Sequence, residues 1–280
     1  MSAALDLPDL RRWIGRSEIV EDLVTPRLMR DYAAMMDHEG SDDIAPLIAP
    51  LAIHWCLAPP AANTTTLGSD GHPARGGFLP PVPLPRRMWA GGRLRLVGRL
   101  HLGDTIQRQS VITDVSVKDG RSGTLCFVTV EHAIMSPRGL AIEEVQNIVY
   151  RDAGAPASPA VPAQRVVPTW VEEKTTNTVM LFRYSALTFN GHRIHYDRSY
   201  AMSEEHYPGL IVHGPLQATW LLEFAAKIYQ TAPKTFHFRG VQPLFDFMAF
   251  RLCALEHDAG LKLWIETADG VPTMEATAQW

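Results

Sequence analysis

The chain has 280 residues, 46% of them hydrophobic, which is enough for one large domain or two of ordinary size. Its formal net charge of −4 offers nothing to attract nucleic acid or an anionic membrane, so an anionic ligand must be held by local cations. It has neither the run of about 18 apolar residues that a membrane span needs nor a secretory signal, and we expect it in the cytoplasm.

A helix is predicted after Thr25, which is a good N-cap and is followed by Pro26 at the first helical position. Residues 27–40 place apolar side chains at helical spacing, and Gly40 is the expected stop. The irregular segment from Pro59 to Pro85, rich in glycine and proline, is typical of a long surface loop, either a lid or an unstructured excursion.

Four strands are predicted after that loop, and glycine-containing turns separate them into an antiparallel meander. Their residues are 91–100, 105–118, 124–135 and 140–151. The next segment, Asp152 to Pro168, replaces alternating apolar residues with alanine and proline. We interpret it as a linker between two domains, residues 1–151 and 169–280.

The second domain repeats the plan of the first. Its predicted elements are a strand over 177–189, a helix from Gly214 to Tyr229, and strands at 238–245, 248–257, 261–268 and 273–280. In each half, a sheet can bury one long helix by wrapping around it. The predicted fold is therefore α+β, a double hot-dog: two antiparallel sheets, each around a central helix, packed edge to edge as a pseudo-dimer with a ligand cleft between them.

The densest group of chemically capable side chains lies in RYSALTFNGHRIHYD, from Arg183 to Asp197. Asn190, His192 and His195 can donate or accept hydrogen bonds there, and the two histidines can transfer protons near neutral pH. These residues are the candidate catalytic group.

Gly214 and Pro215 begin the strongly apolar helix of the second domain. The free N–H groups of a first helical turn can stabilise an enolate oxygen, and glycine lets a thioester carbonyl approach the backbone closely. A Gly-Pro pair also begins many buried helices that have no chemistry, and this feature taken alone favours that simpler interpretation.

Together the two segments resemble MaoC-like (R)-specific enoyl-CoA hydratases, hot-dog proteins that pair a D-x-N-P-x-H loop with a G-x-x-x-H-G helix start. Residues 209–214 match the second element, and His195, with Asp197 after it, matches the end of the first. The chain departs from the pattern at Asn190, where the family has aspartate, and at His192-Arg193, where it has N-P.

A narrower branch is similar over nearly the whole chain: the hydratases of C5 dicarboxylic thioesters such as mesaconyl-C4-CoA (3-methylfumaryl-CoA) and itaconyl-CoA. The segments PLPRRMWAGGRLRL and DGRSGTLCFVTVEH add to that similarity. Type 2 hydroxyacyl-thioester dehydratases are similar too. The resemblance implies a hydro-lyase that forms citramalyl-CoA reversibly from an acyl-CoA substrate, without a metal or redox cofactor.

In the mechanism that the resemblance implies, the Gly214 N–H polarises the thioester carbonyl, and His195 takes a proton from a water held by Asn190. An amide cannot accept a proton, so His195 must act without a carboxylate partner. His213, beside the substrate, is expected to hold the helix start rather than to act as a second base.

A substrate carboxylate would need a cation in the cleft. Arg193 is the first candidate, with Arg183 and His192 as the others. Arg193 can equally pair with Asp197 and only brace the loop.

The first half lacks an equivalent of the histidine loop and is expected to help hold CoA. Arginines there could meet phosphates while a tryptophan packs near the adenine, although each arginine alone is more often an ordinary surface residue. The candidates are Arg86, Arg87, Trp89, Arg93 and Arg121.

Other functions are less well supported by the residues. A dehydratase of ordinary acyl chains would need an apolar tunnel in place of an arginine, and a hot-dog thioesterase usually has a carboxylate where Asn190 stands. A non-catalytic acyl-CoA-binding protein would have kept the fold while losing the aspartate. The widely spaced Cys56, Cys126 and Cys253 form no CxxC site, and no metal is expected. A homodimer would follow from pairing of exposed sheet edges.

Overall fold

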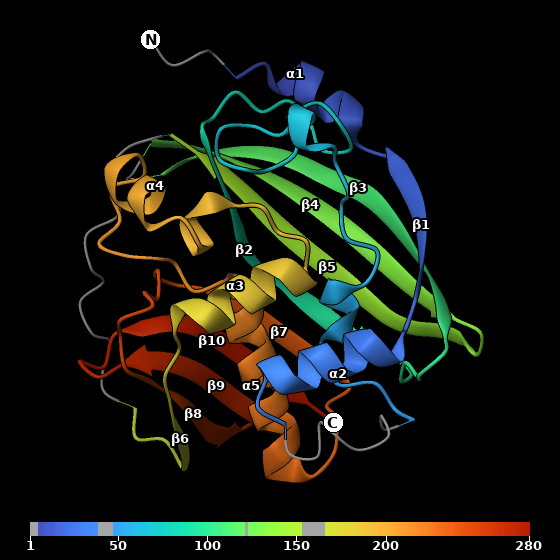
Figure 1. Ribbon diagram of the computed structural model, residues 1–280, viewed down its shortest axis with the longest axis vertical. Helices are drawn as coiled ribbons and strands as arrows, with labels where there is room; N and C mark the ends of the chain where they lie inside the picture. Colours follow the sequence, from blue (N-terminus) through green and yellow to red (C-terminus); the bar gives the residue numbers. More distant parts are fainter. Residues whose placement is uncertain (1–4, 39–46, 121–122, 153–165) are drawn as a thin grey trace.

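A single ten-stranded sheet dominates the computed structural model of the protein, which describes residues 5–38, 47–120, 123–152 and 166–280 (Figure 1). The strand order is β1-β3-β4-β5-β2-β7-β10-β9-β8-β6, and neighbouring strands are antiparallel. Each half contributes five strands, and the orders coincide when β1 to β5 are matched with β6 to β10. The repeated plan predicted from the sequence is confirmed.

The strands of the N-terminal half include the predicted meander β3-β4-β5. Their bounds are β1 (Ser17–Leu23), β2 (Arg86–Leu96), β3 (Thr105–Gly120), β4 (Gly123–Ser136) and β5 (Gly139–Arg151). The strands of the C-terminal half are β6 (Trp170–Lys174), β7 (Thr235–Gly240), β8 (Phe250–His257), β9 (Gly260–Thr267) and β10 (Pro272–Gln279). The two edge strands, β1 and β6, were not predicted because both are short and rich in acidic residues.

The halves join edge to edge, as expected, through antiparallel pairing of β2 with β7, in which Gly92 lies opposite Phe238. The outermost strands of the combined sheet are therefore β1 and β6. A homodimer made by pairing of sheet edges would use one of them, and it stays a prediction.

The C-terminal half-sheet packs on the helix predicted for it. This helix, α5 (Gly214–Tyr229), has the predicted bounds and contacts β7, β8, β9 and β10 (Figure 1). Leu216, Leu221 and Leu222 on it are completely buried. The helix thus supplies the core of its half, and the sheet in turn fixes the helix start at Gly214.

The N-terminal half lacks the long central helix that was expected. Its helix α2 (Pro26–Met35) begins as predicted, because Thr25 Oγ1 accepts a hydrogen bond from the Leu28 N–H at 3.1 Å. It ends at Met35, before Gly40, which lies outside the described residues, so it has 10 residues where α5 has 16. Instead, the long loop covers one end of this half-sheet with Val82 and Leu84, which pack with residues of β3, β4 and β5.

The strand predicted over 177–189 is wrong, because this segment forms α3 (Thr178–Leu187). Asn177 caps the helix by accepting a hydrogen bond from the Met180 N–H at 2.9 Å. Buried Leu181, Tyr184 and Ser185 follow helical spacing, whereas the run of apolar residues in the sequence suits either structure. The segment after α3 that carries His192 and His195, residues 190–197, is the predicted catalytic loop, and it therefore follows a helix.

The remaining helical turns are short: α1 (Leu7–Leu10), η1 (Arg11–Trp13), η2 (Ile53–Cys56), η3 (Thr64–Thr66), η4 (Arg193–His195) and α4 (Arg198–Ser203). Within the described residues, no helix is both long and apolar enough to cross a bilayer. Most of the proposed interdomain linker, 152–168, lies outside the described residues, so the domain boundary stays a prediction.

Candidate functional site

The loop that carries the histidines is held in a tight turn after α3. Phe189 adopts a left-handed conformation (φ 49°), which lets the Asn190 N–H donate to Ser185 O at 2.8 Å. The Asn190 side chain then accepts a hydrogen bond from the His192 N–H at 3.0 Å through Oδ1. Its amide nitrogen remains the donor for a ligand, which agrees with the water-holding role predicted for Asn190.

His195 is a buried, neutral imidazole. It is 7% exposed, and its Nδ1 lies 2.8 Å from the backbone oxygen of Ile211. A carbonyl oxygen only accepts, so Nδ1 carries the proton and Nε2 presents its lone pair. Burial lowers the pKa of His195 to about 4, so the ring is uncharged at neutral pH.

His213 lies directly behind His195. The two rings stack with centroids 3.7 Å apart and an interplanar angle of 18°. His213 is completely buried, its Nε2 lies 2.8 Å from Ser185 Oγ, and burial holds its pKa well below the usual range. A neutral, immobile ring in this position supports His195 and ties α3 to the start of α5.

The start of α5 faces the N-terminal half. Gly214 is the first residue of the helix, so its N–H has no acceptor within it. A Cβ at Gly214 would lie 3.3 Å from Trp89 Cε3, which places β2 against the helix start. Trp89 also packs on Trp55 and Phe238, with ring centroids at 5.3 and 4.7 Å. Trp89 therefore lies against the start of α5, and its expected packing near the adenine of CoA stays a prediction.

The long loop of the N-terminal half reaches the catalytic loop. A Cβ added at Gly71 would lie 1.9 Å from Gly191 O, so only glycine fits this contact. The Arg193 N–H donates to Asp70 O at 2.9 Å, and Arg193 Nη1 donates to Ser69 O at 3.0 Å. Segment 69–72 is thus part of the site.

This contact places two further polar side chains beside the catalytic histidine. The ring of His72 lies 4.0 Å from that of His192, which lies 5.4 Å from that of His195. His72 Nδ1 and Asp70 Oδ2 are 2.9 Å apart. Sequence reasoning missed Asp70 and His72, although a histidine and an aspartate between glycines in an otherwise irregular loop were a usable signal.

Asp70, His72 and His192 could also be considered as metal ligands, since one donor atom from each lies within 4.8 Å of the others. Two of these donors already bond to each other, and a metal would have to replace that hydrogen bond. The expectation of a metal-free site stays a prediction.

Arg193 pairs with Asp197 and so braces the loop, the second of the two roles considered for it. Its Nε and Nη2 both donate to Asp197 Oδ2, at 3.0 and 2.8 Å, and its guanidinium carbon lies 4.2 Å from the centre of the Tyr200 ring. Arg183 is exposed on α3 and makes no hydrogen bond or ion pair with another described residue. The geometry therefore does not favour either arginine as the ligand of a substrate carboxylate.

The predicted CoA residues separate in the structure. Arg86 is buried and pairs with Glu205 at 2.8 Å, Arg87 is half-buried, and Arg93 is exposed on β2. Arg121 lies outside the described residues. Among the described candidates Arg93 is the most exposed, and the roles of all of them in holding CoA stay predictions.

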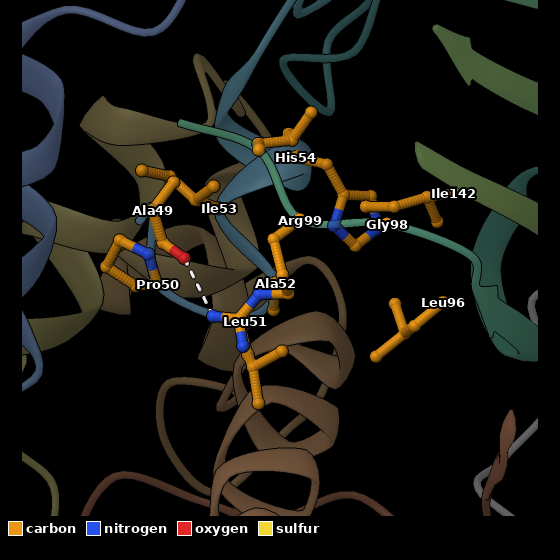
Figure 2. Close-up of a pocket in the computed structure, with 11 residues that line it drawn as sticks. Ala49, Pro50, Leu51, Ala52, Ile53, His54, Leu96, Gly98, Arg99 and Ile142 are labelled. Atoms are coloured by element: carbon orange, nitrogen blue, oxygen red, sulfur yellow. Dashed lines mark hydrogen bonds between the residues drawn. The ribbon is translucent and has the colours of Figure 1, made fainter. Parts of the chain in front are cut away.

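A groove lies next to the site, and a small cavity lies apart from it. A groove of about 410 Å³ borders the catalytic loop and the N-terminal half, with Ser69, Arg86, Arg193 and Tyr200 among its lining residues. A small cavity of about 20 Å³ lies beneath η2, where Arg99 donates to Ala49 O at 3.0 Å across its wall (Figure 2). No residue of the catalytic loop lines this cavity, which has room for about one water.

Comparisons with known proteins agree with this geometry. The profile of the family described as hydroxyacyl-thioester dehydratase type 2 matches residues 52–246. The chain is 44% identical to the mesaconyl-C(4)-CoA hydratase of Chloroflexus aurantiacus over 276 residues, covering 97% of this chain and 98% of the relative.

Solved structures show the same fold. A MaoC-like dehydratase from Phytophthora capsici superposes with a TM-score of 0.70 at 13% identity, covering 99% of each chain. A Mycobacterium tuberculosis protein described as having a double hot-dog fold superposes with a TM-score of 0.57 at 12% identity, covering 95% and 96%. The chain therefore belongs to the hydroxyacyl-thioester dehydratase type 2 family, and it is a hydro-lyase with a MaoC-like double hot-dog fold.

Proposed function

We propose that the protein hydrates a C5 dicarboxylic acyl-CoA, either mesaconyl-C4-CoA or itaconyl-CoA, to citramalyl-CoA. The observation that carries this proposal is the similarity along nearly the whole chain to a mesaconyl-C(4)-CoA hydratase. The neutral, buried His195 supports it, because its Nε2 lone pair is available to activate water.

In the proposed hydration of mesaconyl-C4-CoA, whose double bond is conjugated with the thioester, His195 Nε2 takes one proton from a water molecule that the Asn190 amide holds. The water oxygen bonds to the β-carbon of the substrate, and the electrons of the double bond move to the thioester oxygen as an enolate. The Gly214 N–H at the helix start stabilises that oxygen. The proton on His195 then passes to the α-carbon, which restores the neutral ring.

Dehydration is the same path reversed. The description of the matching family therefore favours a second candidate, a dehydratase of 3-hydroxyacyl thioesters with ordinary acyl chains. Both candidates use His195 in the same way and differ only in what the site accepts at the β-carbon. No step in either needs a metal or redox cofactor.

The test is hydration by the purified protein of itaconyl-CoA, mesaconyl-C4-CoA and crotonyl-CoA. We expect the dicarboxylic substrates to have the higher kcat/KM, and His195→Gln to lower kcat by about 10²- to 10⁴-fold. His257→Gln, which alters a half-exposed histidine on β8, is the matched control and should keep full activity. A preference for crotonyl-CoA would select the second candidate, and no turnover of any substrate would contradict both. Prior dialysis against EDTA should leave the rates unchanged.

A further inference from the structure

We propose that His72 and Arg87, both supplied by the N-terminal half, form with His192 the binding site for the carboxylate of the substrate. This inference rests on the proposed function. It gives the non-catalytic half the task of selecting a dicarboxylic thioester over an ordinary acyl chain.

The chemistry of the substrate limits where such a site can lie. In mesaconyl-C4-CoA the carboxylate is bonded directly to the β-carbon, the atom that receives the water oxygen. The anion therefore lies next to the water and next to the base that activates it. A side chain that binds this anion must therefore be a close neighbour of His195.

His192 and His72 are such neighbours. Ring centroids are 5.4 Å apart between His195 and His192 and 4.0 Å apart between His192 and His72. Asp70 fixes the orientation of His72 by accepting from Nδ1, which leaves Nε2 for a ligand. The carboxylate of Asp70 also supports a proton on His72 when an anion binds.

Arg87 supplies the permanent charge. Burial is the main cause of the lowered pKa of His72 and His192, and the hydrogen bond to His72 is the main cause of the lowered pKa of Asp70; the positive charge of Arg87 adds to all three shifts, so Arg87 lies within electrostatic reach of these groups. It lies opposite Tyr150 in the pairing of β2 with β5.

The other arginines near the site are already paired with acids. Arg193 pairs with Asp197 and Arg86 with Glu205, whereas Arg87 forms no salt bridge with a carboxylate of the described residues. A half-buried guanidinium that has no salt bridge among the described residues and lies within electrostatic reach of two histidines is suited to bind a carboxylate in two-point fashion.

The experiment compares two saturated thioesters that cannot react. Succinyl-CoA carries a carboxylate on its β-carbon, and butyryl-CoA carries a methyl group at the same position. Their dissociation constants are measured by calorimetry for the wild type, Arg87→Gln, His72→Gln and Arg87→Lys. Arg95→Gln is the control, because Arg95 lies on the same strand but is exposed and pairs with Glu143.

We expect Arg87→Gln and His72→Gln to weaken succinyl-CoA binding by about 10- to 100-fold and to change butyryl-CoA binding by less than about threefold. Arg87→Lys, which keeps the charge, should recover part of the loss and guards against a folding defect. Equal losses for both ligands, or none, would overturn the inference while leaving hydration of mesaconyl-C4-CoA intact. If the wild type neither prefers succinyl-CoA nor hydrates a dicarboxylic substrate, the proposed function fails as well.

Discussion

The inner faces of the two half-sheets are covered in different ways. In the C-terminal half, the apolar helix α5 packs on the strands. In the N-terminal half, no single helix of the described residues covers the corresponding face of β4. Cys126 and Val128 pack with the long loop, His132 belongs to a buried polar group, and Ile134 packs in the main hydrophobic core.

The polar group of the N-terminal half is buried. Glu144 is 3% exposed and accepts hydrogen bonds from Trp55 Nε1 at 2.8 Å and Gln146 Nε2 at 2.9 Å. Burial lowers the pKa of His54 to about 3 and that of His132 to about 4. The half without the histidine loop thus buries a polar group in its own core, and its long loop contacts the histidine loop of the other half. After duplication of such a unit, loss of chemistry need not mean loss of a role in catalysis.

The largest expected effect comes from breaking the contact between the two loops. Gly71→Ala should lower kcat by about 100-fold, because a Cβ there pushes the catalytic loop away and displacements of about 1 Å are that costly. Gly15→Ala is the matched control, since Gly15 has the same φ of +86° but open space around its Cβ position. Steady-state kinetics and thermal melts of both variants distinguish the loss of the loop contact from the effect of backbone strain alone. Similar activities of the two variants would show that the contact between the loops does not affect the rate.

The second prediction concerns the pH dependence of the C-terminal half's base. Burial lowers the pKa of His195 to about 4, and the base must be unprotonated, so kcat/KM should be constant above about pH 5. Below about pH 4 it should fall tenfold for each pH unit. A fall in kcat/KM that begins near pH 6.5 as the pH is lowered would show instead that the pKa of His195 is close to the usual value for histidine. Re-assay at pH 7 after exposure to acid controls for unfolding.

A smaller effect is expected from the buried carboxylate of the N-terminal half. Burial raises the pKa of Glu144, so its contribution to stability is complete below the unfolded value and is lost as pH rises through the folded pKa. Glu144→Gln keeps acceptor geometry without charge and should raise Tm at pH 8 by about 2–4 °C, with less gain at pH 4.

Glu143→Gln is the control for that variant, because Glu143 is exposed and pairs with Arg95. Its Tm should change little at either pH. A lower Tm for Glu144→Gln at pH 8 would mean that the charged carboxylate stabilises the fold.

The smallest effects compare the helix caps of the two halves. Thr25→Ala in α2 and Asn177→Ala in α3 each remove one side-chain acceptor at a helix start. Each should cost about 1 kcal/mol in the free energy of unfolding by urea titration. Because α3 leads into the catalytic loop, only Asn177→Ala should also lower kcat. Equal activities would show that the loop is held without its helix.

Local signals made much of this fold predictable. Thr25 with Pro26, and Gly214 with Pro215, marked the two helix starts, and glycine-containing turns marked the meanders. The segment that became α3 was misread because its apolar run fits both a strand and a helix, and only Asn177 favours the helix. Edge strands bury too little to leave an apolar pattern.

The site was predictable only where it is local in sequence. His195, Asn190 and Gly214 stood in recognisable motifs, and their catalytic roles stay predictions. Asp70, His72 and Arg87 could not be connected to them, because the connection is made by tertiary packing of one glycine backbone on another. No periodicity or cap signals such a contact.

Pairing of β2 with β7 also decides what each half can do alone. The fused sheet leaves only the charged, short strands β1 and β6 as edges, and such edges resist aggregation. A C-terminal half produced alone would instead expose the edge of β7, with buried Phe236 and Phe238 beside it. A second copy of the C-terminal half could cover this edge by pairing β7 with β7. The C-terminal half expressed alone should therefore form a homodimer with two histidine loops.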